Sequence, residues 1–265
     1  MPNHVANRIT FDCSDEKAKE ILQSIMYDPK PDDEENTGPG TIDFGKLIPM
    51  PKSLMIEAGS TTTRGIEIYL TAVNPDTEDY DLPKMPKEKF DELVNALNGE
   101  RIFYKYNPSL TEEEIRSATE YHSFGICADL GKQAITNFQN YGATTWYDWS
   151  VRNWGTKWNS YDPYKEDDRS LVFSTAWSAP HPVVEALSKK FPDVSFHHEW
   201  ADEDIGYNCG SMDYRNGEVV SAFEPESMKE AIAFANRVWG YDDEEEITEN
   251  VSDTVPTKSP KMTMA

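Results

Sequence analysis

The first part of the chain has the hydrophobic pattern of a strand followed by a helix. Apolar and polar residues alternate roughly from Val5 to Phe11, which predicts a half-buried strand. Ser14 can then cap a helix, and the acidic residues Asp15 and Glu16 suit its positive end. The apolar residues that follow recur at the spacing of one helical face, and they are Ala18, Ile21, Leu22, Ile25 and Met26. Residues 1–27 are therefore expected to form a strand and a helix that join the main sheet.

The middle of the chain, residues 41–165, is predicted to be a mainly helical insertion. Thr111 and Glu114 match a capping box, in which each side chain satisfies a backbone N–H at a helix start, so a helix is expected to about Tyr121. Prolines push their predecessors out of helical space, which predicts an extended segment over 44–51. Further helices are predicted over 86–97 and 132–141, and a short strand over 66–70.

The last third, residues 166–240, changes to a strand pattern with two helices. Alternating apolar residues predict strands over 171–177 and 194–200, the second with Phe196, His198 and Trp200 on one face. Helical spacing follows over 182–191 and over 225–239, where Met228, Ile232, Ala235 and Trp239 are expected to point inward.

A hairpin completes this region and suggests the fold. Asn216 and Gly217 fit the two positive-φ positions of a type I′ turn, which places Tyr214 roughly opposite Val219. The resulting order, strand, helix, three strands and helix, lacks one strand of a complete split βαβ sandwich. The strand at Val5 to Phe11 is the natural candidate to supply it. The predicted fold class is α/β (α+β), a ferredoxin-like split βαβ sheet with a largely helical insertion.

The charge of the chain restricts its partners. The 265 residues carry a formal net charge of −23, which opposes binding to phosphate backbones and to anionic membranes, so neither nucleic acid nor membrane is expected as a partner. Two acidic runs lie in segments without helical or strand periodicity. Residues 28–40 are therefore predicted to be an acidic loop, and residues 241–265 a disordered acidic tail.

The cysteines and the first residues indicate in which cellular compartment the chain is expected. Cys13, Cys127 and Cys209 are an odd number at wide spacing, which indicates reduced thiols. The first residues lack the apolar stretch of a secretory signal, and no window resembles a membrane-spanning helix. A cytoplasmic location is expected.

The most unusual local feature is a tryptophan-rich segment, which holds four of the seven tryptophans between positions 146 and 158. Aromatic residues at helical spacing usually belong to the core, because indole rings bury a large area. The alternative is an exposed aromatic groove for a peptide or small ligand, with polar residues at its edge. The residues of this candidate binding site are Trp146, Tyr147, Asp148, Trp149, Arg152, Trp154, Lys157 and Trp158.

Three segments together resemble a known family. The chain start MPNHVANRIT, the segment FGKLIPMP from Phe44 and the segment WYDWSVRNWGTKWN from Trp146 are similar to the YubB ferredoxin-like domain family. The resemblance extends over nearly the whole chain up to Trp239. It implies a ferredoxin-like fold and carriage by a plasmid or phage, and it brings no established activity or catalytic residues.

Three classes of function follow. The leading hypothesis is a mobile-element accessory protein that is a non-enzymatic protein-interaction module, acting on a host protein through an acidic surface. The first alternative is binding of a small ligand or peptide by the tryptophan-rich segment. The second alternative is a hydrolase or nucleotide-modifying enzyme, for which the nearest set of residues is His197, Glu199, Asp202 and Asp204.

Support for an enzyme is weak because the usual motifs are missing. The sequence contains no phosphate loop, dinucleotide fingerprint, hydrolase elbow or zincin helix. A zinc site at His197 would require the distant His181 or Cys209 to converge on it. No cofactor, metal or catalytic residue is therefore assigned, and the sequence leaves the oligomeric state open.

Overall fold

The chain forms two compact units. The computed structural model describes residues 3–26, 42–77, 82–99, 111–119, 123–164 and 167–241. One unit, here the sheet unit, comprises Met1–Pro49 and Asn153–Ala265, and the other, the helical unit, comprises Met50–Arg152. The predicted acidic loop at 28–40 and all of the predicted tail except Tyr241 lie outside the described residues.

The sheet unit contains a six-stranded antiparallel sheet in the order β2-β3-β1-β4-β5-β6. Its strands are β1 (His4–Asp12), β2 (Tyr161–Tyr164), β3 (Ser170–Ala176), β4 (Ser195–Asp202), β5 (Cys209–Arg215) and β6 (Glu218–Phe223). Strand β1 pairs with both β3 and β4, so β3, the following helix and β4 form a split βαβ unit with β1 between its strands. The predicted ferredoxin-like sheet, completed by the N-terminal strand, is confirmed.

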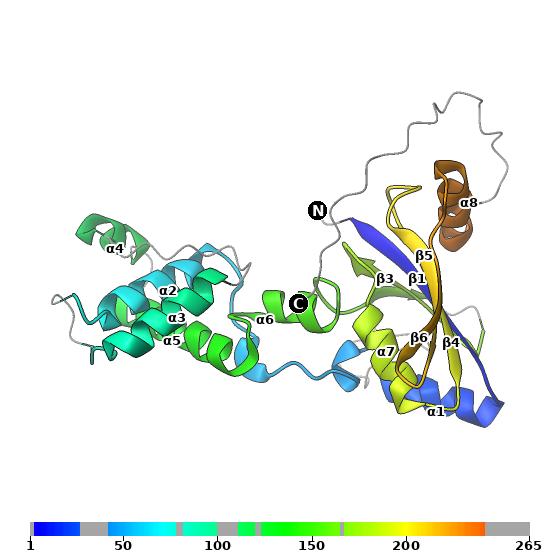
Figure 1. Ribbon diagram of the computed structural model, residues 1–265, viewed down its shortest axis with the longest axis horizontal. Helices are drawn as coiled ribbons and strands as arrows, with labels where there is room; N and C mark the ends of the chain where they lie inside the picture. The colour runs from blue at the N-terminus through cyan, green and yellow to red at the C-terminus, as the bar shows by residue number, and fades with distance from the viewer. Residues whose placement is uncertain are drawn as a thin grey trace. The chain divides into compact units, whose positions relative to one another are not determined.

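Helices cover the two faces of this sheet unequally (Figure 1). Helix α7 (His181–Lys190) lies on one face and α8 (Met228–Trp239) on the other. The α7 face is the more deeply buried side of the sheet, because alternate residues of β1, β3, β4 and β5 point into it. Its buried strand residues include Val5, Ile9, Phe11, Leu171, Phe173, Phe196, His198, Trp200 and Tyr214. Helix α1 (Asp15–Ile25), capped by Ser14 as predicted, contributes the buried residues Ala18, Ile21 and Ile25 to the unit.

Among the described residues, α8 covers only part of the other face of the sheet. Ala6 of β1 and Ala201 of β4 are small, which lets α8 approach with Phe234, Ala235 and Val238. Farther along the sheet, this face carries the polar residues His197 and Glu199 of β4 and Asp213 of β5. Helix α8 begins at Met228 with Ser227 as its cap and not at Pro225 as predicted. Ala235 is buried as predicted, whereas Met228, Ile232 and Trp239 are only half-buried, and the other buried residues of α8 are Ala231, Phe234 and Val238.

The β5–β6 hairpin has the predicted turn and an unpredicted bulge. Asn216 and Gly217 both have positive φ, at 51° and 79°, and Tyr214 pairs with Val219. The next pair joins Asp213 to Ser221, which leaves Val220 as an extra residue in β6. Such a bulge inverts the facing of the residues beyond it. Ser221 and Phe223 therefore point to the α8 face of the sheet.

The described residues of the helical unit form one 3-10 turn and five helices. They are η2 (Lys52–Leu54), α2 (Ser60–Val73), α3 (Lys87–Gly99), α4 (Glu112–Ala118), α5 (Phe124–Tyr141) and α6 (Trp146–Asn153). Helices α2, α3 and α5 share one core, which includes Ile66, Leu70, Phe90, Leu93, Leu97, Ile135 and Phe138. The predicted capping box at Thr111 and Glu114 is present at the start of α4. The predicted helices over 86–97 and 132–141 correspond to α3 and α5, and α5 begins earlier than predicted.

Helices α2 and α5 cross at a pair of glycines. A Cβ atom added to Gly131 would lie 1.9 Å from the carbonyl oxygen of Gly65. One added to Gly65 would lie 2.8 Å from the carbonyl oxygen of Cys127. No side chain fits between the two backbones at this point. The crossing therefore depends on the absence of side chains at both positions.

Several sequence predictions differ from the structure. The strand predicted over 66–70 is wrong, because these residues lie inside α2 and are buried against neighbouring helices on more than one side. The segment predicted as extended over 44–51 begins with a 3-10 turn, η1 (Phe44–Lys46), capped by Asp43. The helical unit spans 50–152, whereas the insertion was predicted over 41–165. Residues 161–164 form strand β2, which the sequence did not indicate.

Candidate functional site

The tryptophan-rich segment is divided between the two units at Arg152 and Asn153. Trp146, Tyr147, Asp148, Trp149 and Arg152 belong to the helical unit, and Trp154, Lys157 and Trp158 belong to the sheet unit. Each group is therefore described within its own unit.

In the helical unit, the predicted site residues hold the α5–α6 connection together. Trp149 is only 6% exposed, while Trp146 and Tyr147 are half-buried with their rings edge to face. Thr144 Oγ1 donates to Asp148 Oδ2 at 3.1 Å, and burial raises the pKa of Asp148. Arg152 Nη1 donates to the carbonyl oxygen of Gly142 at 2.6 Å, at the end of α5.

In the sheet unit, Trp154 is a core residue and Lys157 lies between two indoles. Trp154 is 7% exposed and its Nε1 donates to the carbonyl oxygen of Ile48 at 2.9 Å. The ammonium of Lys157 lies 4.5 Å from the ring centroid of Trp158 and 4.6 Å from that of Trp177. These distances are typical of cation–π contacts. Trp177 was not among the predicted site residues.

Trp177 is exposed and has an unusual backbone conformation. Its φ of 74° lies in the left-handed region, which is disfavoured for a large side chain. Its N–H donates to the carbonyl oxygen of Asn3 at 2.9 Å, and its own carbonyl oxygen accepts from Asn208 Nδ2 at 3.2 Å. The backbone is thus held on both sides, with the indole 42% exposed beside Lys157.

The four residues suggested for an enzyme fall into two groups. His197 and Glu199 lie together on the α8 face, with His197 Nε2 and Glu199 Oε1 3.5 Å apart, as the strand alternation predicts. Asp202 is buried, and both of its carboxylate oxygens accept hydrogen bonds, from Asn3, Asn208 and the N–H of Asp204. It ties the chain start to the β4–β5 loop, away from the His197 group.

The residues considered for a zinc site also lie apart from one another. His181 approaches His198, with ring centroids 5.5 Å apart, while Cys209 contacts the carbonyl oxygen of Ala231 on the α8 face. Burial lowers the pKa of His181 to about 4 and holds that of His198 well below its usual range. Among the described residues, no group of three or more His, Cys, Asp or Glu could hold a metal ion.

A chain of polar contacts crosses the open part of the α8 face, on β4, β5 and β6. His197 Nδ1 lies 2.6 Å from Asp213 Oδ1, and the hydroxyl of Ser221 donates to Asp213 Oδ2. These hydrogen bonds, that of Ser221 first, lower the pKa of Asp213. The carboxylate lies between the hydroxyl and the imidazole, so His197 does not activate Ser221 as it would in a serine hydrolase.

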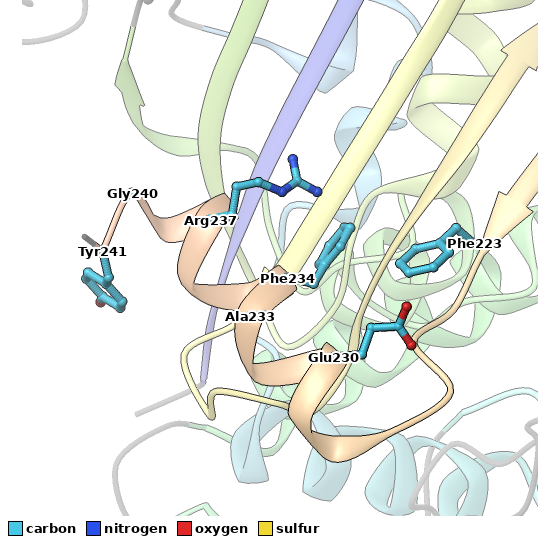
Figure 2. A pocket seen from close by; sticks show the side chains of 7 residues that line it. All are labelled: Phe223, Glu230, Ala233, Phe234, Arg237, Gly240 and Tyr241. Atoms are coloured by element: carbon cyan, nitrogen blue, oxygen red, sulfur yellow. The ribbon is translucent and has the colours of Figure 1, made fainter. Parts of the chain in front are cut away.

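Arg237 connects these residues to a hollow beside α8. Its Nη1 donates to Glu199 Oε1 at 2.7 Å, and its guanidinium carbon lies 4.8 Å from the ring centroid of Phe234. The hollow has a volume of about 540 Å³, and its lining residues are Phe223, Glu230, Ala233, Phe234, Arg237, Gly240 and Tyr241. Figure 2 shows Phe223 projecting from β6 toward Phe234 on the helix. Their ring centroids are 5.5 Å apart.

The hollow has the chemistry of a binding site for an apolar side chain. Two aromatic rings offer it an apolar surface, and Glu230 and Arg237 supply opposite charges seven residues apart on α8. Phe223 faces this hollow only because of the bulge at Val220. Sequence reasoning missed Phe223, Phe234 and Arg237, since a bulge has no clear signal in this sequence. The helical spacing of 230, 233, 234, 237 and 241 was the available clue.

The fold and a family-model match point to the same class of domain. The sheet with helices on both faces is a mixed α/β structure, and the match, which covers less than half of the chain, is to a ferredoxin-like domain. Residues 153–251 match the model of the ferredoxin-like domain in Api92-like protein. A crystal structure of a protein api92 from Yersinia pseudotuberculosis aligns with 86% of this chain and 99% of that chain, at 12% sequence identity and a TM-score of 0.39.

Curated protein sequences do not identify the chain further. No curated protein sequence matches the chain. The matches do not extend to the YubB name. Of the helices in the described ranges, none has the length and apolar character needed to cross a membrane.

Proposed function

We propose that the chain is a non-enzymatic protein-interaction module whose partner binds at the hollow beside α8. The observation that carries this proposal is the pair of rings, Phe223 and Phe234, set in the hollow between Glu230 and Arg237. Aromatic residues and arginine dominate the binding energy of many protein interfaces, and a polar rim around them is typical. Phe223 is 38% exposed and therefore accessible to a partner.

The partner in this proposal is a protein with a basic surface. A net charge of −23 steers basic partners toward the chain and repels acidic ones. The YubB resemblance would place the gene on a plasmid or phage, and the partner is then a cytoplasmic protein of the host. Its apolar side chain enters the hollow, and its basic residues surround that contact.

A variant that fills the hollow tests the proposal. Ala233 is exposed on α8 and lines the hollow, so Ala233→Trp blocks it without disturbing the core. Ala58→Trp makes the same change at an exposed position of the helical unit and serves as the matched control. Affinity capture from host lysate should recover a stoichiometric protein with the wild type and Ala58→Trp but not with Ala233→Trp. Equal recovery by all three proteins would rule out the hollow as the contact surface.

A second candidate function rests on the exposed indole of Trp177 beside Lys157 and Trp158. Backbone strain in a position held by surrounding hydrogen bonds is common at ligand-binding sites. In this candidate, a small ligand or peptide contacts the exposed indole, and Lys157 supplies a positive charge. The expected result is ligand-dependent quenching of tryptophan fluorescence that Trp177→Phe reduces and Trp149→Phe, a change in the core of the helical unit, does not.

A further inference from the structure

The two edges of the sheet differ in their protection against added strands. Edge strands expose unpaired backbone groups, and proteins commonly guard them with short strands, proline, lysine or irregular pairing. Strand β2 has four residues, contains Pro163 and pairs with β3 in an irregular register. It is therefore a guarded edge.

Strand β6 forms the opposite edge and has fewer of these features. All six of its residues are exposed, and it contains neither proline nor lysine. Val219 and Val220 are 51% and 61% exposed, so two branched apolar side chains face solvent on this edge. Among the described residues, its guarding features are the charge of Glu218 and the bulge at Val220, which confines regular pairing with β5 mainly to the stretch from Ser221 to Phe223.

The charge around β6 indicates what could pair with it. Glu218 begins the strand, and Glu224, Glu226 and Glu230 follow it, the last in the lining of the hollow. In a two-fold antiparallel pairing of two β6 strands, Glu218 of each copy would approach Glu224 of the other. Like charges opposite each other destabilise strand pairs. A second copy of the chain is therefore disfavoured, and a basic segment is favoured.

We propose that β6 binds an extended segment of the partner that carries basic residues between apolar ones, and that this segment adds a seventh strand to the sheet. Backbone hydrogen bonds to β6 give affinity in this mode, and alternate side chains give specificity. A side chain of the added strand beside Phe223 faces the hollow, and the basic residues meet the four glutamates. The inference rests on the proposed function, because the hollow and β6 would hold the same segment.

Amide hydrogen exchange with defined peptides tests this pairing. The full chain is mixed with the synthetic peptide Lys-Val-Lys-Phe-Lys-Val-Lys or with its counterpart Glu-Val-Glu-Phe-Glu-Val-Glu. The basic peptide should slow exchange of the amides within 218–223 by about tenfold or more, because new hydrogen bonds protect them. The acidic peptide should leave their exchange unchanged. Binding of the basic peptide without protection of these amides would overturn the proposal.

Two variants of the most exposed edge residue sharpen the test. Val220→Lys guards the edge with a charge that repels the basic peptide, and Val220→Pro removes one backbone donor. Both should weaken binding of the basic peptide by at least about tenfold. Val151→Lys, the same change at an exposed valine of α6, should bind as the wild type does. Equal binding by Val220→Lys and Val151→Lys would contradict the proposal.

The outcomes separate this inference from the proposed function. If Ala233→Trp abolishes capture of the host protein while Val220→Pro captures it normally, the hollow binds the partner and strand addition is wrong. If the chain alone dimerises at micromolar concentration with protection of 218–223, a second copy occupies β6, and the proposed basic segment is wrong. If neither variant alters capture, the proposed function fails as well.

Discussion

The imidazole of His181 stands edge to face against the indole of Trp200, with ring centroids 4.6 Å apart, inside the α7 face of the sheet. His198 lies beside both rings and is fully buried. His181 Nδ1 is 3.1 Å from the hydroxyl of Tyr214, and His198 Nε2 is 3.1 Å from Asn7 Oδ1. The core of the sheet unit thus contains two imidazoles that remain uncharged near neutral pH.

This arrangement predicts a loss of stability in mild acid. Burial lowers the pKa of His181 from its ordinary value of 6.5 to about 4, so between these values the unfolded chain binds more protons than the folded one. The stabilising contribution of His181 to the free energy of unfolding is therefore complete above pH 6.5, and it decreases as the pH drops toward 4. The contribution of His181 is about 3 kcal/mol, given 1.36 kcal/mol for each unit of pKa.

Urea denaturation between pH 4 and pH 7 measures this dependence, and His181→Gln separates it from titration of the carboxylates. Glutamine keeps a polar atom near the Tyr214 hydroxyl but does not titrate. The variant should show a flatter dependence of the free energy of unfolding on pH. An identical slope in both proteins would show that His181 does not control acid stability.

Arg237 and Glu199 should be energetically coupled. The Glu199 side chain is only 9% exposed and accepts from Arg237 Nη1 at 2.7 Å, so Arg237→Met leaves a largely buried carboxylate without this donor. We expect Arg237→Met to lower the free energy of unfolding by about 1.5–3 kcal/mol, the range for hydrogen bonds to charged groups. Glu199→Gln in the same chain should recover part of the loss. A double-mutant cycle by urea denaturation measures the coupling, and strictly additive effects would argue against it.

The glycine crossing of α2 and α5 should not tolerate a methyl group. Gly131→Ala places a Cβ atom 1.9 Å from the carbonyl oxygen of Gly65, which forces the helices apart, and we expect a loss of about 3 kcal/mol. Gly125→Ala on the same helix meets nothing within 4 Å and should stabilise α5 by about 0.4–1 kcal/mol. Thermal unfolding followed by circular dichroism compares the two variants. Similar melting temperatures of the two variants would contradict the close contact between α2 and α5 at these glycines.

The β5–β6 turn offers a test of backbone conformation together with crowding. Gly217 has a φ of 79°, and an added Cβ would lie 3.1 Å from Cβ of Lys189. Gly240, after α8, has a φ of 70° with nothing within 4 Å. Gly240→Ala should lower the free energy of unfolding by about 1 kcal/mol from the left-handed conformation alone, and Gly217→Ala by more. Chemical denaturation distinguishes them, and a smaller effect at Gly217 would contradict the crowding.

Local signals in the sequence were sufficient for many elements of the fold. Ser14, the pair Thr111 and Glu114, and the pair Asn216 and Gly217 act through hydrogen bonds and dihedral angles of neighbouring residues, so the sequence contains the whole cause. The strand predicted over 66–70 failed for the opposite reason. Ile66, Ile68 and Leu70 are all buried within α2, and a helix covered on several sides loses the periodicity that identifies it.

The candidate site was less accessible to sequence reasoning than the fold. The alternation of β4 indicated that His197 and Glu199 share a face, and the structure confirms this. Asp213 and Arg237 reach the same face from other elements, and Ser221 and Phe223 reach it through the bulge. Those placements depend on strand register and helix packing between distant segments, for which one sequence contains no direct signal.

The central place of β1 in the sheet has a consequence for the synthesis of the chain. Val5 pairs with Thr175 on one side and with Asp202 on the other, so both neighbours of β1 leave the ribosome after the whole Met50–Arg152 unit. The helical unit, rich in local contacts, can fold while β1 still lacks partners. During that interval the apolar side chains of β1 are exposed, which invites chaperone binding or aggregation. Nascent chains that stop before β4 are accordingly expected to be insoluble, although their helical unit is complete.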